Sequence, residues 1–210
     1  MLKTPLYRLA LASAAAAFIA GAAYAPSSLA QASDPAAARI ESFDSALIKT
    51  LQAGKAAGAA GRAKVIGPAV EQTFDLPFMT RVSVGPDWTK MSSEDQAALQ
   101  KAFSRYTVAN LAKNFSDYSG QKLELDGAVV DRGADKIVKT KLINPGGSPV
   151  SLAYRMRQDG GTWKVIDVFY NSSISQLTTQ RSDFASTLSS GGAKALVAKL
   201  DAQTEKLLKG

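Results

Sequence analysis

Apolar residues recur at helical spacing in the chain's first half, beginning soon after residue 33. Asp34 and Pro35 are a typical N-cap and first-turn pair, and the stripe that follows predicts a helix through residue 51: Ile40, Phe43, Leu47, Leu51. Residues 54–61 (GKAAGAAG) predict a flexible break. A second helix is expected near residues 65–74, kinked or delayed by Gly67-Pro68, and a short one over 75–84. After Gly85-Pro86, Ser92 or Ser93 caps a long helix that ends at Ser119-Gly120.

The period changes from helical to alternating after Gly120. Four segments alternate apolar and polar residues, namely 122–130, 136–143, 150–157 and 162–170. Glycine-rich turns separate the last three, which predicts an antiparallel meander of four strands. From Ser175 the helical period returns, interrupted once at Gly191-Gly192.

This order of elements predicts an α+β fold, with helices packed on one face of a curved, four-stranded antiparallel sheet. The space between two such layers can be a filled core or an apolar ligand cavity.

The N-terminal segment has the features of a secretory signal peptide. Lys3 and Arg8 precede an apolar, alanine-rich run, and small residues then alternate up to Ala32. Cleavage is expected after Ala30 or Ala32, which makes residues 1–32 the signal peptide and residues 33–210 one domain. An uncleaved N-terminal anchor is the alternative.

Composition excludes several kinds of chemistry. The chain has no Cys and no His, so thiol nucleophiles, thiolate metal sites, Ser-His-Asp triads and His-based zinc sites are all ruled out. We expect no metal, no cofactor and no catalytic residue. Without residues 1–32 the net charge falls from +7 to +5. After export, that charge suits an anionic lipid surface or a partner protein rather than nucleic acid, or it simply keeps a small domain soluble.

One carboxylate stands out in the strand region. Asp167 interrupts the apolar run VIDVFY, where it could be a base with a raised pKa or a structural acid paired with Arg or backbone amides. An isomerase or hydratase that uses Asp167 and Tyr170 is therefore the alternative function. A module with a filled core and no ligand is a third.

Several motifs are similar to one known family. Residues 163–168 are WKVIDV, 174–177 are ISQL and 180–184 are QRSDF, with Gly191-Gly192 following. Earlier segments agree in order: Pro68, Phe74-Asp75, Met79, Gly85-x-x-Trp88, Phe103, Phe115, 118–120. This pattern resembles the MlaC, or toluene-tolerance, family of periplasmic phospholipid-binding proteins over residues 35–205. It is most similar to the hopanoid-associated HpnM branch. Asn171-Ser172 departs from the Asp-Gly usual in the family.

The resemblance implies an MlaC-like fold with an NTF2-like sheet. It also implies a monomeric periplasmic carrier that shuttles a phospholipid or hopanoid. The expected partners are an inner-membrane transporter of the ABC/MCE or RND type and an outer-membrane complex. From pattern and fold together, the predicted lipid-binding residues are Phe74, Phe78, Met79, Val82, Phe103, Tyr106, Leu152, Tyr154, Met156, Val168, Tyr170 and Leu177.

Overall fold

The computed structural model describes residues 34–171 and 173–209, and their contacts assign them to one unit. The expected signal peptide, residues 1–32, lies outside the described residues. No helix within them is long and apolar enough to cross a membrane.

Within the described residues six strands form one antiparallel sheet: β1 (Lys122–Leu125), β2 (Val130–Arg132), β3 (Asp135–Ile143), β4 (Val150–Asp159), β5 (Thr162–Tyr170) and β6 (Ile174–Ser175). The strand order is β1-β3-β4-β5-β6, and β2 also pairs with β3. The meander β3-β4-β5 matches the sequence prediction.

The predicted count of four strands is wrong at both ends of the sheet. Residues 122–130 do not form one strand, because Gly127 takes a φ of +83° and divides the edge into β1 and β2, which both pair with β3. At the other edge Asn171 adopts a φ of +49°, a conformation that Asn tolerates better than most residues, and the chain then returns as β6 beside Phe169 and Tyr170.

In the same part of the chain five α-helices accompany the sheet: α1 (Pro35–Ala53), α2 (Gly58–Thr73), α3 (Leu76–Val84), α4 (Ser93–Asn114) and α5 (Gln176–Lys209). Two short 3-10 segments, Lys55–Ala57 and Gly85–Lys90, join the earlier helices. The expected caps are present, since the side chains of Asp34, Asp75 and Ser92 each accept a backbone N–H in the first turn.

Two predicted helix limits, the start of α2 and the end of α4, differ from the structure. The break after α1 is shorter than residues 54–61, because α2 already begins at Gly58. Pro68 lies inside α2 without delaying its start. The long helix α4 ends at Asn114, before Ser119-Gly120, and Gly192 (φ +64°) interrupts α5 as the sequence suggests.

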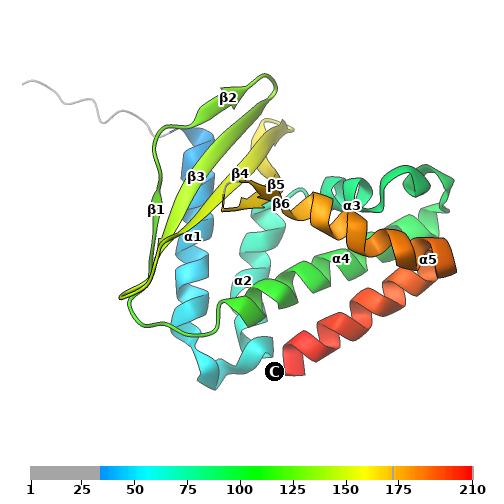
Figure 1. Cartoon of the computed structure of the whole chain (residues 1–210), viewed down its shortest axis with the longest axis horizontal. Helices are drawn as coiled ribbons and strands as arrows, with labels where there is room; N and C mark the ends of the chain where they lie inside the picture. Colours follow the sequence, from blue (N-terminus) through cyan, green and yellow to red (C-terminus); the bar gives the residue numbers. More distant parts are fainter. Residues whose placement is uncertain (1–33, 172, 210) are drawn as a thin grey trace, which may run out of the picture. The chain divides into compact units, whose positions relative to one another are not determined.

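One apolar core joins the helices to the sheet. In Figure 1, α1 and α2 run beside the strands, while α3, α4 and α5 extend away from them. Tyr154 and Met156 of β4 point into the core, and Arg155 between them points to the other face of the sheet. Farther from the sheet, Phe103 of α4 packs edge-to-face on Phe184 of α5 with ring centroids 6.3 Å apart. The packed core therefore lies partly between helices rather than wholly against the sheet.

Candidate functional site

A pocket of about 460 Å³ lies between the inner face of the sheet and the helices. We call it the inner pocket. The long strands β3, β4 and β5 contribute to its wall, together with α1, α3, α4, α5 and Phe74, which directly follows α2. Its apolar lining residues are Phe43, Leu47, Leu51, Phe74, Met79, Leu111, Phe115, Leu142, Val150, Leu152, Tyr154, Val168 and Tyr170.

Aromatic side chains fix one wall of the inner pocket. Phe43 of α1 packs edge-to-face on Phe74, with centroids 5.0 Å apart, and on Tyr154, with centroids 6.2 Å apart. Tyr154 is buried, and burial together with the nearby Asp44 raises the pKa of its phenol. The ring therefore stays neutral, and the pocket wall carries no charge there.

The remaining lining residues are polar and almost all uncharged: Thr107, Asn110, Asn114, Ser116, Asp117, Gln121, Asn144, Gln176 and Gln180. They come mainly from the end of α4, the loop after it, the β3–β4 turn and the start of α5. Asp117 is the single charged residue that residues 34–171 and 173–209 bring to the lining, and its carboxylate pairs with Lys55 at 2.7 Å. Tyr170, at 43% exposure, also reaches solvent. The inner pocket thus combines an apolar interior with an amide-rich polar part.

The structure brings half of the predicted lipid-binding residues into this pocket. These are Phe74, Met79, Leu152, Tyr154, Val168 and Tyr170. Phe78, Val82 and Leu177 line a different pocket, on the other side of the sheet. Phe103 and Met156 are fully buried in the core, and the partly buried Tyr106 packs against that core.

Sequence reasoning missed the contribution of α1. Phe43, Leu47 and Leu51 were assigned to a helix stripe but not to a binding wall. Their signal was the i, i+4, i+8 spacing, which shows one buried face without showing what that face meets. Leu111 of α4, and Leu142 and Val150 near the β3–β4 turn, are likewise absent from the predicted lining.

The proposed acid–tyrosine pair does not meet in one site. Tyr170 lines the inner pocket, whereas Asp167 lines the pocket on the other face of the sheet. Asp167 accepts hydrogen bonds from the Ser175 hydroxyl at 2.7 Å and from two backbone amides, of Val168 at 2.8 Å and of Leu177 at 3.3 Å. These contacts give Asp167 a structural role, because they link β5 to β6 and to the start of α5.

Comparisons with known proteins show which fold and which family this chain shares. A search of curated proteins found no match. Among solved structures, the chain is similar to a phospholipid-binding protein from Ralstonia solanacearum, determined in complex with a phospholipid. The TM-score is 0.71 at 21% sequence identity, with 83% of this chain and 99% of that chain covered. This likeness shows that the two proteins share a fold. The family model described as MlaC protein matches residues 41–202, so the chain belongs to the MlaC family.

Proposed function

We propose that this protein is a periplasmic lipid carrier that holds the hydrocarbon tail of a membrane lipid in the inner pocket. The single observation that carries the proposal is an apolar hollow of about 460 Å³ between the sheet and the helices. The phospholipid held by the structurally similar Ralstonia solanacearum protein supports it.

The apolar lining of the inner pocket suits a hydrocarbon tail, because such a tail leaves no polar group without a partner when it is buried there. We therefore propose a phospholipid with its tail enclosed as the primary cargo, and a hopanoid as the cargo that would connect the chain to the HpnM branch.

The polar part of the inner pocket suits the region just below a lipid headgroup. Asn110, Asn114, Gln121, Asn144 and Gln180 offer amide donors and acceptors of the kind that ester and glycerol oxygens use. Among the described residues the lining has one paired carboxylate and no cationic side chain, so these residues form no charged clamp for the headgroup. Such a site binds by the tail and tolerates different headgroups.

Release of the cargo requires a partner. Transfer of a sixteen-carbon chain from water is worth on the order of 12 kcal/mol at about 0.8 kcal/mol per methylene, so loss to water is slow. We propose that an inner-membrane transporter of the ABC/MCE or RND type and an outer-membrane complex exchange lipid with this protein as a monomer. An N-terminal signal peptide over residues 1–32 would deliver it to the periplasm.

The test is the mass of the intact protein purified from periplasm under native conditions. We expect a bound lipid, which fragmentation identifies as phospholipid or hopanoid. The variant Leu152→Trp should carry much less lipid, because the indole fills the inner pocket from β4. Ser151→Trp is the matched control, since its side chain leaves the same strand on the opposite face. Equal lipid load in Leu152→Trp and wild type would show that the inner pocket does not hold the tail.

A further inference from the structure

A second pocket, of about 350 Å³, lies on the outer face of the sheet between α3, β4, β5 and the start of α5. We call it the outer pocket. Three of its lining residues are arginines, Arg155, Arg157 and Arg181. Its apolar lining residues are Phe78, Val82, Ile166 and Leu177. The inner pocket shares no lining residue with it.

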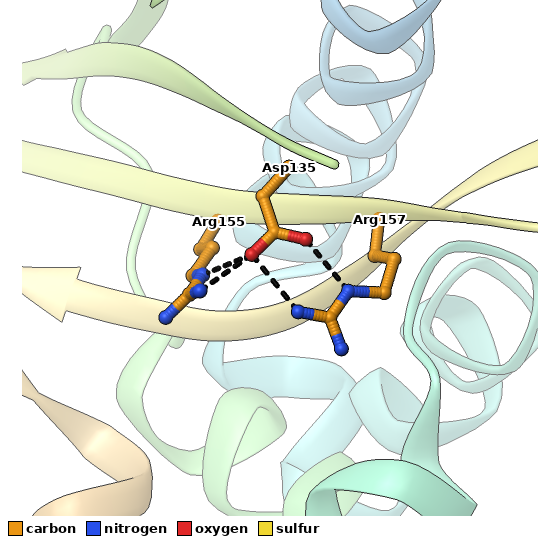
Figure 2. A network of polar contacts seen from close by, with 3 residues as sticks. All are labelled: Asp135, Arg155 and Arg157. Atoms are coloured by element: carbon orange, nitrogen blue, oxygen red, sulfur yellow. Dashed lines mark hydrogen bonds and ion pairs between the residues drawn. The ribbon is translucent and has the colours of Figure 1, made fainter. Parts of the chain in front are cut away.

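Two of the arginines are fixed by one buried carboxylate. Figure 2 shows Asp135 between the guanidinium groups of Arg155 and Arg157. Arg157 donates from Nε to Oδ1 at 2.6 Å and from Nη2 to Oδ2 at 3.0 Å, while Arg155 contacts Oδ2 from Nε at 2.6 Å and Nη2 at 2.5 Å. Asp135 is 2% exposed, and the Arg157 and Arg155 hydrogen bonds lower the pKa of its carboxyl against the opposing effect of burial. The carboxylate therefore stays ionised and holds both arginines in place.

The ring of Phe78 restricts Arg157 further. The guanidinium carbon of Arg157 lies 5.3 Å from the ring centroid, and that of Arg81 lies at the same distance. Cations at this distance are attracted to an aromatic face. Arg157 is thus held by its carboxylate and by an aromatic ring before any ligand arrives, which lowers the entropic cost of binding one.

Donors remain unused on all three arginines. A guanidinium has five N–H donors, and the contacts to Asp135 engage two nitrogens of Arg155 and two of Arg157. Both side chains keep 40% or more of their surface exposed. Arg181 lies against Gly85, and within residues 34–171 and 173–209 it forms no ion pair. The carboxylate in the lining, Asp167, is already occupied by Ser175 and two backbone amides.

From this arrangement we infer that the outer pocket is a binding site for the phosphate or carboxylate group of a small amphiphile. The guanidinium groups of Arg155, Arg157 and Arg181 match the planar, paired acceptors of such an oxyanion. The apolar side chains of the same pocket cover the carbons next to the anionic group. The oxyanion comes either from a membrane lipid headgroup or from a soluble phosphate ester. This site is separate from the tail-binding pocket and does not depend on the proposed function.

Hexyl phosphate and inorganic phosphate are the probes, titrated into the full protein by calorimetry at low ionic strength. We expect hexyl phosphate to bind at least tenfold more tightly than inorganic phosphate, because only the ester uses the apolar wall. Arg181→Gln should lower the affinity for hexyl phosphate at least tenfold. Arg155→Gln should also lower this affinity, and it leaves the paired contact between Arg157 and Asp135 in place. Lys101→Gln, which removes an exposed cation from α4, is the control for loss of one positive charge and should change affinity less than twofold.

The variants also separate this site from the inner pocket. Leu152→Trp should bind hexyl phosphate as wild type does, and Arg181→Gln should keep its lipid load. Two results would overturn the inference, whether or not the inner pocket binds a lipid tail. The first is equal affinity of wild type and Arg181→Gln for hexyl phosphate. The second is weaker binding of hexyl phosphate in Leu152→Trp but not in Arg181→Gln. Competition by phosphatidylglycerol vesicles, but not by phosphatidylcholine vesicles, would assign the oxyanion to a lipid headgroup. Failure of both vesicles to compete, with hexyl phosphate still bound, would assign it to a soluble ester.

Discussion

The buried carboxyl of Asp44 gives the fold an unusual dependence on pH. Asp44 lies on α1 at 5% exposure, and its Oδ1 atom has no hydrogen-bond partner among the described residues. Burial, with a smaller contribution from the neighbouring Glu41, raises its pKa to about 7 from 3.8. The groove beside it also holds Lys49 and Glu124, and neither forms an ion pair with Asp44 in the part of the chain described.

The sign of the effect follows from proton linkage. Between pH 3.8 and about 7 the folded protein keeps a proton on Asp44 that the unfolded chain releases. The free energy of unfolding therefore falls as pH rises through this window, by about 1.4 kcal/mol per pH unit from this group. From pH 5 to pH 8 the loss amounts to roughly 2–3 kcal/mol, and ionised Asp44 costs the fold about 4 kcal/mol in all.

The test is urea unfolding of wild type and Asp44→Asn from pH 5 to pH 8. Asn stays neutral, so the stability of the variant relative to wild type should increase by roughly 2–3 kcal/mol over this range. Glu71→Gln, an exposed acid on α2, is the control and should show a much smaller change in relative stability over this pH range. If the difference in free energy of unfolding between Asp44→Asn and wild type stays constant from pH 5 to pH 8, Asp44 ionises in the folded protein as it does in water.

Two further substitutions test the sheet and the helical core. Asp135→Asn should lower the free energy of unfolding at pH 7 by about 1.5–3 kcal/mol, because charge-assisted hydrogen bonds to Arg155 and Arg157 are lost. Since the folded-state pKa of Asp135 is lowered, this deficit should persist above pH 3.8 and shrink as the pH falls below it in acid unfolding. If Asp135→Asn were as much less stable than wild type at pH 2–3 as at pH 7, ionised Asp135 would not be the source of the lost stability. Phe103→Ala should cost about 3–5 kcal/mol in urea unfolding, because the fully buried ring leaves a cavity beside Phe184; a cost below about 1 kcal/mol would mean that the site collapses or is already loosely packed.

Local sequence determined most of the secondary structure. Asp34, Asp75 and Ser92 begin their helices as expected because an N-cap depends only on the next three residues. Alternation over residues 136–170 predicted the central meander because side-chain direction in a strand repeats every two residues. Motifs spread along the chain also indicated the family to which the chain belongs.

Other local signals were overridden by packing. Pro68 and the glycines at 58 and 61 are weak helix formers, yet α2 includes all three and buries Ile66 and Val70 in the core. Gly127 was not distinguishable from an ordinary strand residue until its positive φ divided the edge of the sheet. In α2, burial of one helix face outweighed intrinsic preference. At Gly127 the backbone takes a positive φ that glycine adopts freely, and the pairing of both β1 and β2 with β3 decided where the edge divides.

Tertiary structure alone decided which apolar and charged residues share a site. Phe43 and Phe103 both lie on apolar helix stripes, but only Phe43 meets the strands, so it lines the inner pocket while Phe103 fills the core. Asp135 is 20 residues from Arg155 in sequence, and only the register of β3 on β4 brings the two together. A periodic pattern specifies which face of an element is buried, whereas a pocket depends on where that face meets elements far away in the chain.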